Sequence, residues 1–474
     1  MKHTIFTKRN SDWVFTTLGH LSFLILLIAS VYYFKERILY ADSAFQLFKI
    51  IHFEKINVEA FRYGAILPEL PVLLAVKLGV SLKLLIITFS AAFIALYYII
   101  FLLCIKPLKN TAAGLSVILT FIMCIGKSFF FPVTETQQSL VFCVLLFAIL
   151  QYPNFRSSWV QILLASAVII LSFLAHPVAL YPLAFIIGYS AIDKKQLRSI
   201  MPYALLALVI GMAVAKVMLT DENSYEGYFF SELLKSPSLI LDLPNFYSTN
   251  FFITRIFGLY FWVVIFQFIL IFYFILKKEY LKLSWQLGIS VFFLLITLLT
   301  YHVDSPEMLI ERSFMPLALL TSIPLLHELL ENDKQHKILK LTFLSLVIVV
   351  SLNRIYTQGK VFRERTQFNQ ELMAKTAKLP NRKFIVEASE LQKHIDSGWS
   401  YSFETLLLSS ITDNTPTQTI FPAYNISKVT KYTETRDVFM GADFWLEWSI
   451  DNLNHKYFNL SKEMPYTIVK IDDL

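Results

Sequence analysis

The feature that most constrains this chain is a series of apolar blocks separated by short polar clusters. Each block is about 17 to 25 residues long, which is the length that a helix needs to cross the hydrocarbon core of a bilayer. Because lipid offers no partners to open backbone groups, helices are the structure that such blocks adopt. The blocks end near residue 355, and charged residues return at ordinary density beyond it. The pattern predicts a polytopic membrane protein with a soluble C-terminal domain.

The overall composition agrees with a membrane-embedded chain. Of the 474 residues, 56% are hydrophobic and only 16% are charged, which is far from the composition of soluble globular proteins. The net charge of +7 does not indicate nucleic-acid binding, because Lys and Arg fall mostly in the short loops that orient membrane proteins. The cysteines all lie inside apolar blocks, which excludes a disulfide framework in the soluble domain; they are Cys104, Cys124 and Cys143.

The apolar blocks predict about eleven transmembrane helices. The predicted spans are 13–34, 84–105, 111–131, 139–152, 159–175, 177–192, 202–219, 251–276, 285–301, 314–330 and 339–355. This arrangement places the Lys-rich loops 106–109 and 277–282 on one side, and the acidic loops Asp221–Asn250 and His302–Ser313 on the other. Because positively charged loops stay in the cytoplasm, the N-terminus is predicted inside and the C-terminal part outside. We expect the first block to remain as an anchor, since it has no obvious small-residue cleavage site.

The chain is predicted to divide into a transmembrane domain, 1–355, and an extracytoplasmic soluble domain, 356–474. The first outer loop, 35–82, holds an amphipathic stretch at Ser43–His52 and a Pro-punctuated apolar stretch at Ala65–Val80, and both are typical of helices in the membrane interface. The soluble domain is predicted to contain helices at Thr366–Leu379 and Trp399–Leu408, and strands at Lys383–Glu387 and Tyr466–Ile471. The predicted fold class is an all-α polytopic membrane protein with a small C-terminal α+β domain.

Charged residues near the outer ends of the spans are the candidates for chemistry, because charge at membrane depth is costly and often functional. Asp42 follows the first span and begins the amphipathic stretch. Its carboxylate could act as a general base towards an acceptor hydroxyl or amide. Alternatively, Asp42 or Ser43 caps the helix, with Ser43 and Gln46 forming a capping box. The sequence leaves both interpretations open.

Arg62 and Glu135 each have a functional and an ordinary interpretation. Arg62 lies in the first outer loop, where its guanidinium suits a phosphate through paired hydrogen bonds, but it could equally pair with Glu59 or reach a lipid headgroup. Glu135 lies at the outer turn between the third and fourth spans, where it could contact a substrate or a metal. An acid in the first turn of a helix is also ordinary, and Thr134 with Gln137 matches a capping box.

Four further residues are candidates for binding substrate. Lys127 lies within an apolar run just before the turn that carries Glu135, where a cation needs a partner or an anionic ligand. His176 marks an outer hairpin, where a lone histidine is more often structural than a ligand. His302 and Arg312 belong to a charged outer loop, and the Arg312 guanidinium is suited to hold a lipid-linked phosphate. A solvated loop with local ion pairs is the alternative.

With these residues in place, the layout resembles the GT-C superfamily of membrane glycosyltransferases, and in particular the protein O-mannosyltransferase and aminoarabinose transferase group. The resemblance covers most of the membrane part. It rests on an acid that opens the first outer loop, a Pro-containing apolar stretch with its Gly-Val-Ser-Leu continuation, an acidic outer turn, a His-Pro hairpin and an Arg-then-Pro entry into a late span: Asp42, Leu67–Pro71, Gly79–Leu82, Glu135, His176-Pro177, and Arg312 to Pro316. Asp42 has no second acid beside it, and Arg62 stands where a His-Pro-Pro-like element is often seen, which leaves the donor class and metal use open.

The resemblance implies inverting transfer of a sugar from a polyprenyl-phosphate-type carrier to a protein, glycan or lipid acceptor on the outer face. Asp42 would deprotonate or orient the acceptor, and the cations would neutralise the phosphate leaving group. The predicted substrate-binding set is Arg62, Lys127, Arg312, Glu135, His176 and His302. No cofactor is certain and no metal ligand is assigned, although a divalent metal is compatible with the family. The implied partners are the bilayer, the lipid-linked sugar and the acceptor, and the implied location is the bacterial inner membrane.

Two other functions fit the same layout. A transporter or flippase of lipid-linked saccharide would also have many spans, but it should show polar residues at mid-membrane depth and matching halves. The ionisable residues of this chain gather instead at the outer ends of the spans. A non-catalytic partner in a cell-envelope complex would use the transmembrane body to position the soluble domain, and Asp42→Asn would then leave its function intact.

Overall fold

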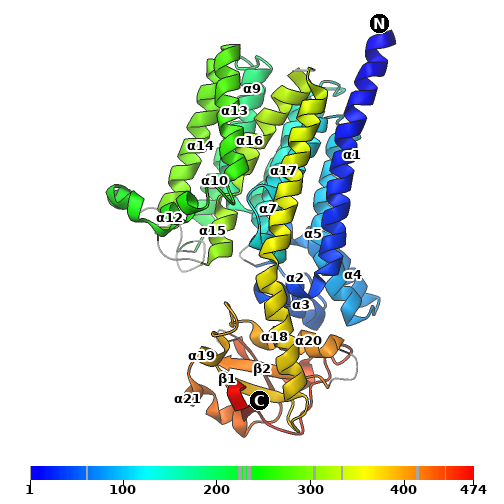
Figure 1. Cartoon of the computed structure of the whole chain (residues 1–474), viewed down its shortest axis with the longest axis vertical. Helices are drawn as coiled ribbons and strands as arrows, with labels where there is room; N and C mark the ends of the chain where they lie inside the picture. The colour runs from blue at the N-terminus through cyan, green and yellow to red at the C-terminus, as the bar shows by residue number, and fades with distance from the viewer. Residues whose placement is uncertain are drawn as a thin grey trace.

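The computed structural model describes residues 2–59, 62–221, 227, 231, 236–302, 306–332, 335–412, 416–442 and 445–473. Long helices run side by side as a bundle, with the N-terminus at one end and a strand-containing C-terminal part, called the C-terminal domain below, at the other (Figure 1). Parts of two predicted outer loops lie outside the described residues, in Asp221–Asn250 and at positions 303–305.

Each predicted span falls on an apolar helix of the bundle. These helices are α1 (Lys2–Tyr32), α5 (Leu82–Ile105), α6 (Thr111–Ile122), α7 (Glu135–Gln151), α8 (Ser158–Ala175), α9 (Leu180–Asp193), α10 (Ile200–Leu219), α13 (Phe261–Lys277), α14 (Tyr280–Thr300), α16 (Pro316–His327) and α17 (Lys337–Gln358). Within the described residues, 7 helical segments are long and apolar enough to cross a membrane, and four further apolar helices are shorter. The chain is therefore an integral membrane protein, and the total of eleven crossings stays a prediction.

Short elements connect the bundle helices. Those at the end nearer the C-terminal domain are α2 (Phe34–Ile38), α3 (Ala41–Phe53), η1 (Tyr63–Ala65), α4 (Ile66–Lys77), η2 (Lys127–Phe130), η3 (Pro177–Ala179), η4 (Ser236–Asn245), α12 (Tyr247–Thr254) and α15 (Glu307–Ser313). At the opposite end, the π-helical turn η5 (Glu328–Asn332) continues α16.

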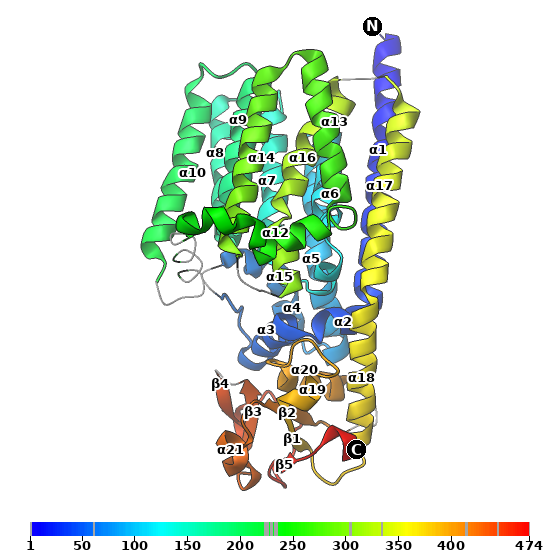
Figure 2. The same cartoon turned by 60° about the vertical axis from the view of Figure 1, so that its left-hand side comes forward.

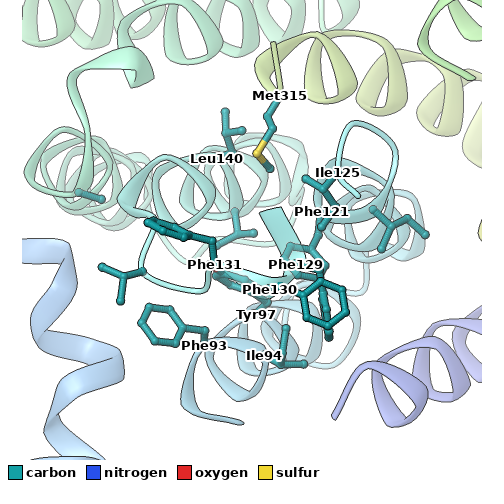
Figure 3. Packing of buried hydrophobic residues seen from close by; sticks show 14 of the residues in the cluster. Phe93, Ile94, Tyr97, Phe121, Ile125, Phe129, Phe130, Phe131, Leu140 and Met315 are labelled. Atoms are coloured by element: carbon teal, nitrogen blue, oxygen red, sulfur yellow. The ribbon is translucent and has the colours of Figure 1, made fainter. Parts of the chain in front are cut away.

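An aromatic core lies where α5, α6 and η2 meet. Figure 3 shows Phe93 and Tyr97 of α5 beside the run Phe129–Phe131, with Leu140 and Met315 closing the cluster. Tyr97 and Met315 are fully buried. This packing fixes the backbone just before α7. Carbonyl oxygens of this backbone accept hydrogen bonds from the Arg312 guanidinium.

The break between α6 and η2 is held by two charged side chains. The Glu311 carboxylate accepts hydrogen bonds from the backbone N–H groups of residues 126–128, at 2.7, 3.2 and 2.9 Å. The Arg354 guanidinium donates to the carbonyls of Ile122, Met123 and Ile125, at 2.8, 2.7 and 3.1 Å. Because the end of a helix leaves backbone groups without helical partners, these two side chains satisfy groups that the helix itself does not.

A buried ionic cluster lies at the end of the bundle opposite the C-terminal domain. The Lys282 ammonium of α14 contacts carboxylates of Asp193 at 2.8 Å, Glu328 at 2.6 Å and Glu279 at 2.9 Å. His327 of α16 contacts the second Asp193 oxygen at 3.0 Å. Three helices that are distant in sequence are thereby tied together.

The C-terminal domain consists of helices α18 to α21 and five strands. Its helices are α18 (Lys360–Thr376), α19 (Ala388–Leu391), α20 (Tyr401–Ile411) and α21 (Ile426–Val429), with short 3-10 turns η6 (Thr430–Thr433), η7 (Ile450–Asn452) and η8 (Ile471–Asp473). Strands β1 (Lys383–Glu387), β2 (Thr419–Ala423) and β5 (Thr467–Ile468) form a parallel sheet in the order β2-β1-β5, and β3 (Val438–Ala442) pairs antiparallel with β4 (Trp445–Ser449).

The predicted elements of this domain agree with the structure in part. The strand at Lys383–Glu387 is β1, and the predicted helix at 399–408 overlaps α20, which lies between the parallel strands β1 and β2. Such strands need a crossover connection, commonly a helix. Of the predicted strand at 466–471 only the two residues of β5 form a strand, and the sequence pattern does not predict β2, β3 or β4. Strand β2 is not predicted because all of its residues are buried, so its sequence lacks the polar alternation that marks a strand.

The amphipathic stretch of the first outer loop differs from its predicted setting. It forms α3, which lies between the bundle and the C-terminal domain (Figures 1 and 2). Every residue from Ser43 to Ile51 is buried. Phe45 packs against Trp399 and Phe403 of the C-terminal domain, with ring centroids 5.6 and 5.2 Å apart. Helix α3 is therefore covered by protein, whereas the sequence predicts a helix that lies in the membrane interface.

Candidate functional site

A cavity of about 260 Å³ lies among the ends of the bundle helices that are nearer the C-terminal domain. One part of its lining is charged or polar and comes from the first outer loop, α7, the α8–η3 turn, α10 and α15: Arg62, Glu135, His176, Lys216 and Arg312. The other part is apolar or aromatic and comes mainly from α8, α9, α10 and α14: Phe173, Leu180, Tyr181, Val217, Phe293 and Ile296. The cavity lining thus combines cationic with apolar side chains.

Arg62 and Glu135 meet in this cavity. A guanidinium nitrogen of Arg62 lies 3.2 Å from a carboxylate oxygen of Glu135, the first residue of α7. The alternative pairing of Arg62 with Glu59 is not the one observed, because the Glu59 carboxylate takes its ion pair from Lys49. An arginine of the first outer loop is thereby fixed at the start of a bundle helix.

The capping box predicted at the start of α7 is absent from the described structure. Thr134 is the N-cap residue, but its side chain makes no capping hydrogen bond within the described residues. Gln137 instead accepts a hydrogen bond from the Tyr97 hydroxyl at 3.3 Å. Gln137 therefore bonds to Tyr97 of α5 and not to the start of its own helix, and Glu135 pairs with Arg62.

Arg312 lies across the end of the aromatic core. Its guanidinium donates to the carbonyl oxygens of Phe131 at 2.9 Å and Val133 at 3.4 Å, and it lies 4.1 Å from the centroid of the Phe131 ring. Its Nε–H group is buried and has no hydrogen-bond partner within the described part of the chain. Buried donors are nearly always satisfied, so this group is an exception among the described residues.

His176 has the structural role that its position in a hairpin indicated, and it also lines the cavity. Its Nδ1 accepts a hydrogen bond from the backbone N–H of Val178 at 3.1 Å, which caps η3. In a neutral imidazole the proton is then on Nε2, so that nitrogen is a donor. The hairpin therefore adds a hydrogen-bonding ring to the wall of the cavity.

Asp42 lies beside the cavity, close enough to the charged residues for their fields to act on it. Burial raises the pKa of its carboxyl group to about 6; the charge of Arg312 opposes this rise, Glu135 adds to it and Arg62 opposes it. Asp42 is not among the described residues that line the cavity. The structure thus brings together a carboxylate and a cationic pocket from segments more than 250 positions apart in sequence.

The capping interpretation of Asp42 and Ser43 is wrong for this helix. The N-cap residue of α3 is Tyr40, and no side chain of the described residues caps the helix there. The Ser43 hydroxyl is buried without a hydrogen-bond partner in the described residues. Asp42 occupies the first turn, where a carboxylate complements the helix dipole. The interpretation of Asp42 as a functional carboxylate remains.

Lys127 and His302 lie elsewhere. The Lys127 ammonium contacts Glu307 at 2.5 Å, and Glu307 also contacts Arg255 at 2.5 Å. The His302 ring nitrogen lies 3.2 Å from the carbonyl oxygen of Leu299. Neither Lys127 nor His302 is among the described residues that line the cavity, so the structure does not place these two with the other predicted ligands.

Two residues of interest were not selected from the sequence. Lys216 lies in the last turn of α10 and lines the cavity; the available signal was a cation inside an apolar block. Glu69 of α4 is buried, accepts a hydrogen bond from the Asn57 backbone N–H at 2.9 Å, and has its pKa raised to about 8 by burial. In the sequence, Glu69 belongs to the Pro-containing stretch Leu67–Pro71.

The described residues contain no group of three or more His, Cys, Asp or Glu side chains that could hold a metal ion, so no metal position is assigned. Comparison with protein-family models, with curated proteins and with solved structures finds no match for this chain.

Proposed function

We propose that this chain is a membrane glycosyltransferase that moves a sugar from a polyprenyl-phosphate-type carrier to an envelope acceptor. The observation that supports it is that one cavity is lined both by the cations Arg62, Lys216 and Arg312 and by apolar side chains. A phosphate attached to an isoprenoid chain likewise combines an anionic group with an apolar chain. Guanidinium groups bind phosphate through paired, charge-assisted hydrogen bonds, and apolar walls favour the chain.

The position of Asp42 supports a transfer reaction in addition to binding. A carboxylate whose pKa is near 6 is ionised at neutral pH and is a stronger base than an ordinary aspartate. In the proposed step, Asp42 takes the proton of the acceptor group as the acceptor atom bonds to the anomeric carbon of the sugar. The bond from that carbon to the phosphate oxygen breaks, and its electron pair leaves with the phosphate. Arg62, Lys216 and Arg312 stabilise the charge that develops there.

Glu135 has a supporting part in this proposal. Its carboxylate forms an ion pair with Arg62 in the lining of the cavity. A phosphate that binds Arg62 would compete with this carboxylate, and the released carboxylate would be available to sugar hydroxyl groups. This assignment predicts that Glu135→Gln alters the apparent affinity for the sugar more than that for a sugar-free lipid phosphate.

The proposal includes a topology. Eleven crossings would put the N-terminus in the cytoplasm and the C-terminal domain outside the bacterial inner membrane, on the same face as the cavity. The Lys-rich loops then face the cytoplasm. A reporter fused after residue 360 should score as exported, and a cytoplasmic result would reject the eleven-span count.

The function is tested by sugar transfer from polyprenyl-phosphate sugars by purified protein in lipid nanodiscs. Wild type is compared with Asp42→Asn and Arg312→Ala, and with Glu463→Gln as a control because Glu463 is an exposed carboxylate of the C-terminal domain. We expect transfer by wild type and by the control, and a loss of at least about 100-fold for Asp42→Asn, the usual contribution of a general base. Equal activity in all four proteins would reject the site, and no transfer from any donor would favour a non-catalytic partner.

A further inference from the structure

The chain turns sharply at Ala41, the residue before Asp42. Ala41 has φ +42°, in the left-handed region that residues with a Cβ rarely adopt. Such a conformation is strained and persists where the surrounding structure enforces it. Because Ala41 is the first residue of α3, its conformation sets the direction in which the first turn, and with it Asp42, is presented.

The C-terminal domain supplies the contact that enforces this turn. The backbone N–H of Ala41 donates a hydrogen bond to the Glu404 carboxylate of α20 at 3.1 Å. The same carboxylate accepts from the Arg365 guanidinium at 2.6 Å and from the Ser400 hydroxyl at 2.7 Å. Glu404 is 1% exposed and Arg365 is 5% exposed, so the pair is shielded from water. A buried acceptor that is itself fixed by a cation makes a rigid support.

Tyr40, on the other side of Ala41, is held by the same group of residues. Its hydroxyl donates to the Asp396 carboxylate at 3.1 Å, and its ring lies 4.7 Å from the Arg365 guanidinium carbon. Arg365 in turn donates to Asp396 at 3.3 Å. Arg365 of α18 therefore holds both carboxylates that bond to the turn, Glu404 to Ala41 and Asp396 to Tyr40.

We infer that the C-terminal domain is a clamp that positions Asp42, with Glu404 and Arg365 as positioning residues. The clamp holds Ala41 in its left-handed conformation and so fixes the Asp42 carboxylate relative to the cationic cavity. The role of Asp42 in this inference rests on the proposed function, whereas the clamp is a property of the fold. Two separate measurements therefore test the two parts.

The clamp is tested first by the accessibility of the turn, which needs no substrate. Ser43→Cys replaces a hydroxyl that is buried and has no hydrogen-bond partner among the described residues by a thiol. The native cysteines give little background labelling because each is 0% exposed. Maleimide labelling is measured in nanodiscs for Ser43→Cys alone and combined with Glu404→Gln, Tyr40→Phe or the exposed control Glu463→Gln.

We expect Glu404→Gln to raise the labelling rate about tenfold or more, because the neutral amide loses the charge-assisted hydrogen bond from Arg365 that fixes this side chain. Tyr40→Phe should raise the rate less, because it leaves the Ala41 contact in place, and it serves as the milder variant if Glu404→Gln folds poorly. The control should leave the rate unchanged. Equal rates for Glu404→Gln, Tyr40→Phe and the control overturn the clamp, whatever the protein catalyses.

The positioning role is then tested by rescue. Glycine adopts positive φ without a steric penalty, so Ala41→Gly should restore the turn when the clamp is weakened. In sugar transfer, Glu404→Gln should lower kcat about tenfold with little change in KM for the donor, and Ala41→Gly in that background should recover most of kcat. Unchanged kcat in Glu404→Gln, or no rescue by Ala41→Gly, overturns the positioning role. A wild type that is inactive on every donor overturns the proposed function, and the labelling rates still decide the clamp.

Discussion

Replacement of Asp42 by asparagine should stabilise this protein at neutral pH while it abolishes activity. Burial raises the pKa of the Asp42 carboxyl group from 3.8 to about 6. A folded-state pKa above the unfolded value means that the folded protein binds the proton more tightly than the unfolded chain. The ionised carboxylate therefore destabilises the fold above pH 6, and this penalty disappears as the pH falls through 6 towards 3.8.

The size of the effect follows from the two pKa values. Proton linkage gives a penalty of about 3 kcal/mol at about pH 7.5, and roughly half of that at about pH 5. Asparagine keeps the shape of the side chain without the charge, so Asp42→Asn should recover most of this free energy of unfolding. At roughly 2 °C per kcal/mol, the apparent Tm should rise by about 5 °C at neutral pH.

The assay is thermal unfolding of purified wild type, Asp42→Asn and Asp472→Asn at about pH 7.5 and about pH 5, where the penalty differs about twofold. Asp472 is an exposed carboxylate at the C-terminal end, so its replacement controls for the loss of one charge. The difference in Tm between Asp42→Asn and wild type should shrink at the lower pH, and Asp472→Asn should match wild type at both. A lower Tm for Asp42→Asn at neutral pH, or a difference that does not change with pH, would refute the burial argument.

Three further predictions concern the cavity and the bundle. Arg312→Ala should weaken binding of a polyprenyl phosphate, measured by displacement of a fluorescent lipid phosphate, about tenfold to hundredfold, because it removes a charge-assisted donor; wild-type affinity would remove Arg312 from the site. The transfer rate should rise with pH through about 6 and level off above it, since Asp42 must be ionised to accept a proton, and a rate that is flat between about pH 5 and pH 7.5 would contradict that role. Lys282→Met should lower the apparent Tm by an amount equivalent to about 3 kcal/mol, because Asp193 and Glu328 lose their cation. The affinity of this variant for lipid phosphate should stay within about twofold of wild type, because the cluster lies at the opposite end of the bundle from the cavity.

Local sequence patterns predicted the bundle helices and strand β1, but they did not predict which side chains hydrogen-bond to distant partners. The capping boxes at Ser43 and at Thr134 match their pattern, yet neither forms within the described residues. At the second, Gln137 bonds to Tyr97 of another helix. In the C-terminal domain, β1 was predicted with its observed bounds, whereas the fully buried β2 lacks the alternation that reveals a strand.

The sequence by itself determined that this is a membrane protein and which segments form its helices, because the length and apolarity of a block are sufficient to favour a helix in lipid. It also identified Asp42, Arg62, Glu135, His176 and Arg312 as charged or polar groups in costly positions. Only the tertiary structure decided that these five come together, that Lys127 and His302 do not join them, and that the C-terminal domain holds the turn before Asp42. The reason is physical: the cost of burying a charge is a property of one segment, whereas the partner that offsets this cost is supplied by whichever segment packs beside it.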